Sequence, residues 1–239
     1  MIESYAFDEM KAIASGAHRD KQNKVAVCLG DQKPTGYCGF ETARELFRNL
    51  GYPKFLDIDY NGLAAAHADL NQPITLEDQF ADIVYDVGVV EHVANIGQAL
   101  QTIVRITKVG GWVIMVYPVN NYGESYYALD PQLHRDFFEA NGFLTAKLKV
   151  FSRGGLRGSL IRAAQAIIPE KIKARLIERF RSGTAVKGFC LRDDPSEIKW
   201  HPVGRDFNRY PLTAHTFYVG VRTDVTPLTW PSQRKYPKA

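Results

Sequence analysis

Cysteines are few in this sequence, and long apolar runs are absent. The three cysteines, Cys28, Cys38 and Cys190, include no close pair, which argues against a disulfide framework or a zinc site and favours a reducing compartment. The most apolar stretch, Trp112 to Val116, is far shorter than the roughly 20 residues that span a bilayer. The N-terminal residues also lack an apolar segment followed by a small-residue cleavage site. We therefore expect a cytoplasmic protein without a membrane-spanning helix.

The common nucleotide-binding glycine motifs are missing too. The loop Gly30-Asp31-Gln32-Lys33-Pro34-Thr35-Gly36 follows the first apolar run. It matches neither the Gly-x-Gly-x-x-Gly pattern of dinucleotide sites nor the Gly-Lys-Ser/Thr pattern that cradles phosphates. Hydride transfer and nucleotide hydrolysis are therefore disfavoured.

The composition fits one globular domain with an uneven charge. The chain has 239 residues, 45% of them hydrophobic, and a net charge of +4, so we expect a single domain over residues 1–239. The segment from Lys147 to Arg192 contains twelve lysines and arginines but only two glutamates. We interpret residues 152–200 as a basic helical insertion that would meet any acidic partner.

Short apolar runs alternate with segments of helical periodicity. The predicted strands are Lys24–Gly30, Lys54–Ile58, Ala81–Val87, Gly111–Tyr117, Ala146–Phe151 and Thr216–Val221. The predicted helices are Phe40–Leu50, Ile96–Thr107 and a helix that starts at Asp130 and ends at Gly142. This alternation predicts βαβ units and a parallel sheet with a ligand beyond the carboxyl ends of its strands.

Two acidic positions near the second predicted strand suit a nucleoside. Asp57 would place a carboxylate where a ribose diol can donate two hydrogen bonds. Asp69 and Leu70 would offer an acceptor for an adenine amino group and an apolar surface for its ring. Solvated loop acids and an ordinary turn before Pro73 are the alternative readings.

Two further motifs follow these acids along the chain, and the order of all these motifs is similar to that of a known family. Val90-Glu91-His92 follows the strand Ala81–Val87, and Arg105-x-x-Lys108-x-Gly110-Gly111 precedes the next strand. Residues 24–151 thereby resemble the class I S-adenosylmethionine-dependent methyltransferases, particularly small-molecule enzymes with a Leu-Glu-His-like motif. The resemblance implies an α/β fold with a Rossmann-like, mainly parallel sheet, flanking helices and an antiparallel final strand.

The resemblance also implies the cofactor, S-adenosylmethionine, and the residues that bind it. Asp57 would hold the ribose hydroxyls, Asp69 the adenine amino group and Leu70 the adenine ring. Asp86 and Val87 would make backbone contacts near the methionine part. The complete expected cofactor set is Gly30, Asp31, Asp57, Ile58, Asp69, Leu70, Asp86 and Val87.

Glu91 and His92 would face the reaction side of the site, without a metal. His92 is the candidate base for a hydroxyl acceptor, although a histidine at such a junction can also cap a helix. Asn121 and Tyr122, after the strand Gly111–Tyr117, are the expected substrate contacts, with turn formation as the alternative. His134 is expected on the surface of its helix.

The first loop departs from the family pattern. Cys28 stands where the family has an acid, and Gln32 stands where it has a second glycine. The leading interpretation is methyl transfer to oxygen or nitrogen of a small molecule, such as a sugar or glycan precursor of polysaccharide biosynthesis. The alternatives are a catalytically silent methyltransferase-like binding module and an RNA methyltransferase.

The basic segment leaves its partner open. Glu170 to Arg181 would form an amphipathic helix that acts as a lid or satellite helix, or meets an anionic membrane surface or a phosphate-bearing substrate. Only one aromatic residue, Phe180, lies among its basic ones, which is too few for stacking on a single strand and disfavours nucleic acid. We expect a cytoplasmic protein that could lie at the membrane periphery.

Overall fold

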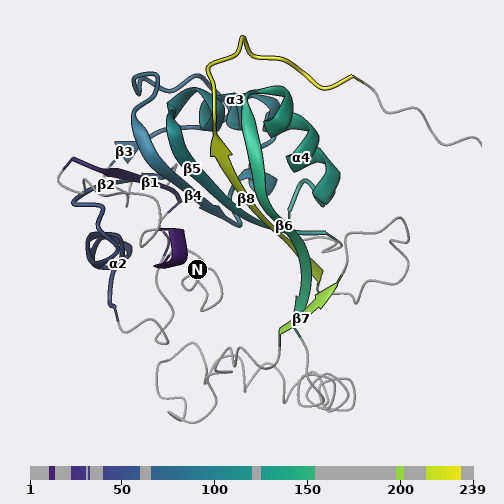
Figure 1. The fold of residues 1–239 in the computed structure, drawn as a ribbon, viewed down its shortest axis with the longest axis horizontal. Helices are drawn as coiled ribbons and strands as arrows, with labels where there is room; N and C mark the ends of the chain where they lie inside the picture. The colour runs from purple at the N-terminus through teal and green to yellow at the C-terminus, as the bar shows by residue number, and fades with distance from the viewer. Residues whose placement is uncertain are drawn as a thin grey trace, which may run out of the picture.

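A mixed β-sheet forms the centre of the computed structural model (Figure 1). The structure describes residues 11–13, 23–30, 32, 40–59, 66–119, 125–153, 198–201 and 214–232. The sheet has eight strands in the order β3-β2-β1-β4-β5-β8-β6-β7. They are β1 (Val25–Leu29), β2 (Lys54–Asp59), β3 (Ala66–His67), β4 (Ala81–Val87), β5 (Thr107–Pro118), β6 (Phe143–Arg153), β7 (Ile198–His201) and β8 (Ala214–Arg222).

The strand directions confirm the expected topology. Strands β3, β2, β1, β4 and β5 are parallel to one another. Strand β8 is antiparallel to both β5 and β6, and β7 is antiparallel to β6. The carboxyl ends of the parallel strands therefore lie at one edge, with β1 between β2 and β4.

Side chains that cap the backbone set where the helices begin. The helices are α2 (Ala43–Asn49), the 3-10 turn η1 (Val90–His92), α3 (Ile96–Ile106) and α4 (Pro131–Ala140). Thr42, Asn95 and Asp130 each accept a hydrogen bond from a backbone amide of the first turn of α2, α3 and α4, respectively. Helix α4 thus begins where Asp130 predicted, whereas α2 begins three residues after Phe40 because Thr42 caps it.

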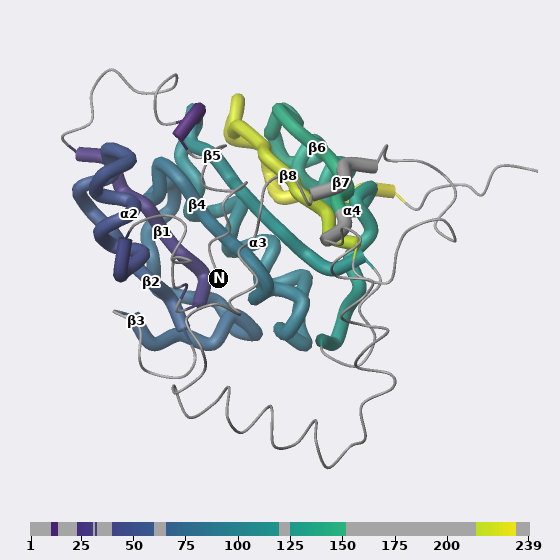
Figure 2. The backbone as a smooth tube through the Cα atoms, turned by 90° about the horizontal axis from the view of Figure 1, so that it is seen from below, coloured from purple at the N-terminus to yellow at the C-terminus, as the bar shows by residue number. Residues whose placement is uncertain are grey.

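The side chains of each strand point alternately to the two faces of the sheet, so they contribute to two hydrophobic cores, one on each face. On the face with α2, Phe47 packs with Cys28 and Tyr85. On the other face, Ile103 of α3 and Phe137 of α4 belong to a second core. Figure 2 shows these elements around the central strands. The sheet is covered on both faces, as parallel sheets require.

Some local details differ from the sequence prediction. Strand β5 begins at Thr107, since Thr107 pairs with Ala81 before a register shift brings Trp112 opposite Ile83. The segment from Lys108 to Gly110, which was expected to precede the strand, is therefore an irregular part of β5. The surface placement of His134 is wrong: its side chain is buried and stacks on Tyr117 with ring centroids 4.8 Å apart.

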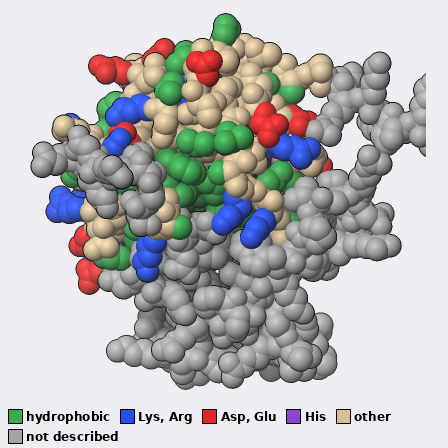
Figure 3. Space-filling view, viewed as in Figure 1, with side chains coloured by type: hydrophobic (Ala, Val, Ile, Leu, Met, Phe, Trp, Pro, Cys, Tyr) green, Lys and Arg blue, Asp and Glu red, His purple; other side chains and the backbone are tan. Residues whose placement is uncertain are grey.

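Most of the expected basic insertion, residues 154–197, lies outside the described residues. Its two ends are strands, since β6 continues to Arg153 and β7 begins at Ile198. Figure 3 shows one face of the molecule, where apolar side chains gather near the middle and lysine, arginine and acidic side chains are scattered around them. In the described part of the chain, no helix is long and apolar enough to cross a membrane.

Candidate functional site

A cavity of about 430 Å³ lies at the ends of β2 and β3 and beside η1. Its volume is within the range of small-molecule sites, about 300–1,000 Å³. Its position matches the rule that α/β sheets bind ligands beyond the carboxyl ends of their strands. The residues that line it are Ile58, Asp59, Ala68, Asp69, Leu70, Asn71, Val89, His92, Val93, Ala94 and Tyr126. We call it the strand-end cavity.

A short turn holds Asp69 in the strand-end cavity. The Oδ1 atom of Asp69 accepts hydrogen bonds from the backbone and side-chain nitrogens of Asn71, at 2.9 and 2.8 Å. Asn71 Oδ1 in turn accepts from the amide of Asn95, the capping residue of α3, at 2.8 Å. Both of these hydrogen bonds use Oδ1, so Oδ2 is available to an amino group. Leu70, next in the chain, lines the same cavity.

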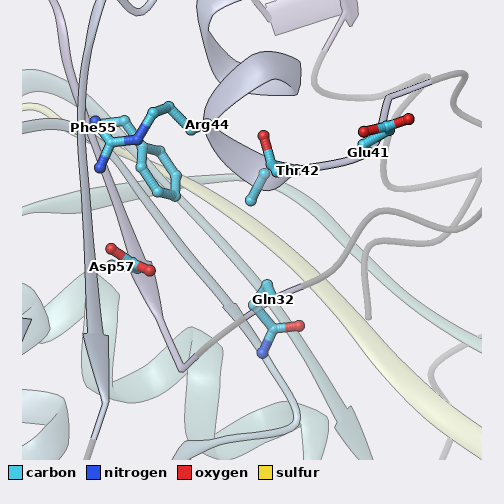
Figure 4. Close-up of a pocket in the computed structure, with 7 residues that line it drawn as sticks. Gln32, Glu41, Thr42, Arg44, Phe55 and Asp57 are labelled. Carbon is cyan, nitrogen blue, oxygen red and sulfur yellow. The ribbon is translucent and has the colours of Figure 1, made fainter. Parts of the chain in front are cut away.

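The structure separates two acids that are two residues apart on β2. Asp59, the last residue of β2, lines the strand-end cavity with Asp69. Asp57 instead lines a second cavity of about 250 Å³, shown in Figure 4 with Gln32, Arg44 and Phe55. The structure therefore brings Asp69, with Ile58, Leu70 and His92, into one cavity and leaves Asp57 in another.

Asp59 lines the strand-end cavity but was not predicted from the sequence as a site residue. The signal was present, because the sequence Leu56-Asp57-Ile58-Asp59 offers two acids at the end of one strand. Which acid faces which cavity depends on where β2 ends, and the predicted strand stopped at Ile58, one residue short of the observed end.

Two residues, Gly30 and Gln32, have unusual roles at the carboxyl end of β1. Gly30 has φ +75°, and a Cβ there would lie 2.7 Å from Val89 Cγ2, so only glycine fits. The side-chain nitrogen of Gln32 donates to the carbonyls of Val87, at 2.9 Å, and Leu29, at 3.2 Å. Gln32 thus ties the carboxyl ends of β1 and β4 together. Its amide occupies the Val87 carbonyl that was expected to meet the cofactor.

Cys28 of β1 is fully buried, and burial together with the charge of Asp57 holds the pKa of its thiol well above the ordinary value. The register places Cys28 opposite Asp57 on β2 and Tyr85 on β4. A neutral thiol here cannot supply the negative charge of the acid found in the family.

The two motif residues Glu91 and His92 point to different environments. His92 is exposed and lines the strand-end cavity. Glu91 is only 3% exposed, and its backbone carbonyl accepts hydrogen bonds from the amides of Tyr126 and Tyr127, at 3.0 and 3.3 Å. Only His92 can therefore meet a ligand in this cavity without a rearrangement.

Asp86 offers a buried side chain in addition to the expected backbone contact. The Tyr117 hydroxyl donates a hydrogen bond to Asp86 Oδ2. Burial raises the pKa of Asp86 to about 7, against the opposing effects of Tyr117 and the nearby amides of Val89 and Val90. Burial, and then the charge of Asp86, raise the pKa of Glu91 to about 8.

Three expected site residues, Asp31, Asn121 and Tyr122, lie outside the described residues. Among the residues that the structure describes, no group of three or more histidine, cysteine, aspartate or glutamate side chains could hold a metal ion.

Comparisons with known proteins agree with the fold. Residues 35–115 match the family described as "Methyltransferase domain". A comparison with curated protein sequences finds no significant match.

Solved structures give the same architecture at low sequence identity. A Bacillus halodurans protein assigned as a methyltransferase is 12% identical with a TM-score of 0.50, over 91% of this chain and 98% of that chain. Phosphoethanolamine N-methyltransferase 2 of Haemonchus contortus, solved with S-adenosyl-L-methionine, is 16% identical with a TM-score of 0.51, over 94% and 54%. MccD protein is 15% identical with a TM-score of 0.50, over 92% and 97%. At these identities the likeness establishes a shared fold.

Proposed function

We propose that this chain is an S-adenosylmethionine-dependent methyltransferase that methylates an oxygen or nitrogen atom of a small molecule. The match of residues 35–115 to the methyltransferase-domain family and the shared fold support the proposal. The observation that carries the proposal is the strand-end cavity, in which Asp59, Asp69 and Leu70 meet. These three residues come from β2 and from the turn after β3, at the edge of the sheet where such ligands bind.

The hydrogen-bond acceptors of the cavity fit the adenosine part of the cofactor. Asp69 Oδ2 can accept from the adenine amino group, while Oδ1 stays in its bonds to Asn71. The Leu70 side chain offers an apolar contact for the ring. We assign the ribose hydroxyls to Asp59 rather than Asp57, because Asp59 shares the cavity with Asp69. A carboxylate can accept two hydroxyl donors at once.

The chain's own contribution to the reaction is alignment and a base. S-adenosylmethionine, when bound, supplies an electrophilic methyl group. Holding the acceptor close to that group accounts for most of the catalysis in this proposal. Where the acceptor is a hydroxyl, the exposed imidazole of His92 is available to accept its proton. The acceptor class that we propose, from the family resemblance, is a sugar or glycan precursor.

A second candidate function is a silent module that binds through the same fold without methyl transfer. The observation in its favour is the loop after β1. There Gln32 donates to the carbonyls of Leu29 and Val87, and the buried thiol of Cys28 replaces an acid.

Calorimetric titration of the purified full-length protein separates the two candidates. We expect both S-adenosylmethionine and S-adenosylhomocysteine to bind, and the protein to methylate members of a panel of hydroxyl and amine acceptors. Binding without turnover on any acceptor would favour the silent module. No binding of either compound would contradict the methyltransferase proposal.

A further inference from the structure

The segment after β8 runs along two helices without forming a strand or helix itself. It comprises residues 223–232, which we call the strap. Figure 1 shows the strap in yellow beyond β8, beside α3 and α4. Just before it, Arg222 Nη1 donates a hydrogen bond to the Val104 carbonyl in the last turn of α3, at 2.8 Å. Trp230, near the other end of the strap, lies at the first turn of α3. The strap therefore spans the length of this helix.

A buried asparagine fixes Thr229 of the strap to the end of α4. The Thr229 amide donates to Asn141 Oδ1, and the Thr229 carbonyl accepts from Asn141 Nδ2, both at 2.8 Å. Asn141 is fully buried, and its Nδ2 also donates to the Phe137 carbonyl of α4, at 2.7 Å. Because one side-chain amide uses both its acceptor and its donor on the same residue, the backbone of Thr229 is held in one position.

The next residue, Trp230, lies over the first turn of α3. Its ring packs on the Phe137 ring of α4 with centroids 5.1 Å apart. A Cβ added at Gly97 would lie 3.1 Å from Trp230 Cη2 and 3.7 Å from Asn95 Oδ1. Glycine at position 97 therefore lets the indole ring approach the helix backbone beside Asn95, the capping residue of α3.

Asn95 connects this first turn to the strand-end cavity. Its amide donates to Asn71 Oδ1 at 2.8 Å, and its Nδ2 donates to the Asn71 carbonyl at 3.3 Å. Asn71 in turn donates two hydrogen bonds to Asp69 Oδ1, at 2.8 and 2.9 Å. A continuous series of contacts thus leads from Trp230 to the carboxylate that meets the adenine amino group in the proposed function.

We propose that the strap supports the cofactor site: Trp230, packed on Gly97, holds Asn95 and Asn71 in place and so orients the Asp69 carboxylate toward the adenine. Asn95 is exposed and Asn71 is half-buried, so water competes for each of their hydrogen bonds. A ring fixed over this turn restricts the alternatives. Trp230 does not line the strand-end cavity, so it is a positioning residue that acts through Asn95.

The orientation of Asp69 decides which nucleobase the cavity prefers. This consequence rests on the proposed function, whereas the series of contacts does not. Adenine presents an amino donor to the carboxylate, but hypoxanthine has a carbonyl at the same ring position, and two acceptors cannot pair. A site built around a donor of its ligand discriminates strongly against the analogue that lacks it. Loss of the strap contact should therefore weaken the preference for adenine rather than all binding.

Amide exchange tests whether Trp230 holds the turn, and it needs no cofactor. Nuclear magnetic resonance of the full chain should show the Asn95 amide exchanging about tenfold faster or more in Trp230→Ala, because the turn opens more often. The amide of Ile103, further along α3, should exchange as in the wild type. Trp230→Phe keeps a ring over Gly97 and should restore most of the protection. Leu228→Ala is the control, since Leu228 is a 43% exposed strap residue that lines a cavity of about 400 Å³ beside α3.

Calorimetry tests the effect on the adenine. The two ligands are S-adenosylhomocysteine and S-inosylhomocysteine, in which a carbonyl replaces the amino group. The wild type and Leu228→Ala should prefer the adenosyl compound by about tenfold or more. Trp230→Ala should lose most of this preference, with little change in its affinity for the inosyl compound. Asn71→Ala should lose it too, and combining Asn71→Ala with Trp230→Ala should add little, because the two residues act in one series.

The outcomes separate this proposal from the proposed function. Unchanged exchange at Asn95 in Trp230→Ala would overturn the hold of the strap on the turn, whether or not the protein binds the cofactor. Faster exchange with an unchanged preference would overturn the link to adenine. Equal weakening of both ligands would mean a general structural role and would overturn that link as well. If the wild type binds neither compound, the proposed function fails, and the exchange rates alone decide whether the strap holds the turn.

Discussion

Neighbouring residues of η1 have opposite environments. In a 3-10 turn, consecutive side chains point about 120° apart, so Glu91 can face the buried end of β4 while His92 faces the strand-end cavity. The motif that suggested a pair of catalytic residues therefore divides into an inner acid and an outer imidazole.

His92→Ala tests the outer residue. If His92 accepts the proton of a hydroxyl acceptor, its removal should lower kcat about 100-fold, a typical contribution of a general base. The dissociation constant of S-adenosylmethionine should stay nearly unchanged, since the contact matters mainly in the transition state. Steady-state kinetics and calorimetry on the same preparation provide both quantities.

His67→Ala is the matched control, because His67 is an exposed histidine of β3 that does not line the cavity. It should change neither quantity. A His92→Ala variant with full turnover would mean that alignment alone drives the reaction. A variant that instead loses cofactor affinity would make His92 a binding residue.

Gln32 is the second residue whose role can be measured. Its side-chain nitrogen donates to the carbonyls of Leu29 and Val87, at the ends of two adjacent strands. Carbonyls in this arrangement would also suit an ammonium group, which carries three donors. If the amino group of the cofactor uses them, Gln32 must first give up its two hydrogen bonds.

In the wild type, binding of S-adenosylmethionine must break the hydrogen bonds of Gln32, and in Gln32→Ala it need not. The variant should therefore bind the cofactor more tightly, by about fivefold for each kcal/mol that breaking these bonds costs the wild type. Gln101→Ala, on α3, is the control and should bind as the wild type does. Weaker binding by Gln32→Ala in calorimetry would show that the amide builds the site rather than blocks it.

At the scale of elements, the end of α4 shows how local geometry fixes a chain reversal. Gly142 follows the helix with φ +77°, and a Cβ there would lie 2.7 Å from the carbonyl oxygen of Asp224. The Gly142 carbonyl also accepts the amides of Thr223 and Asp224 at 2.8 and 3.2 Å. The start of β6 and the segment after β8 are thus held together at this glycine.

Gly142→Ala should lower the free energy of unfolding by more than Gly110→Ala. Both glycines have positive φ, at 77° and 78°, but nothing lies within 4 Å of a Cβ at Gly110. The left-handed backbone alone costs an alanine about 1–2 kcal/mol, and the contact with Asp224 adds to this only at Gly142. Denaturant unfolding of both variants measures the difference, and equal losses would rule out the steric part.

The elements that the sequence predicted well carry their own local signals. Asp130 and Pro131 begin α4 where expected, and the apolar run of β4 has the predicted bounds. The elements that were missed depend on distant partners. Strand β3 has two residues that pair with β2, and β7 pairs with β6 from the far end of a long insertion. Neither contains a pattern long enough to predict a strand.

The same distinction holds for the site. The sequence identified Asp69, Leu70 and His92, which lie in the connections after β3 and β4, and they share one cavity. It could not separate Asp57 from Asp59, because this depends on the last residue of β2 and on the neighbouring turn. It also could not place the Asp86 side chain, whose burial depends on Tyr117 in the next strand.

At the scale of the whole molecule, the sheet brings distant segments to one edge. Asp59 ends β2, Asp69 follows β3, and His92 follows β4, yet all three line the strand-end cavity. The cavity with Asp57 lies by the start of α2, with Thr42 and Arg44 in its wall. The central claim is that adenosine binds in the first cavity and not in the second.

The most direct test is a calorimetric titration of S-adenosylhomocysteine into the wild type, Asp59→Asn and Asp57→Asn. The two variants make the same chemical change two positions apart on β2, so each controls for the other. Losing the charged acceptor of two ribose hydroxyls should cost Asp59→Asn about 1–3 kcal/mol, or roughly 5- to 150-fold in affinity. Asp57→Asn should bind as the wild type does. Weakened binding in Asp57→Asn with unchanged affinity in Asp59→Asn would contradict this account and place the ribose in the other cavity.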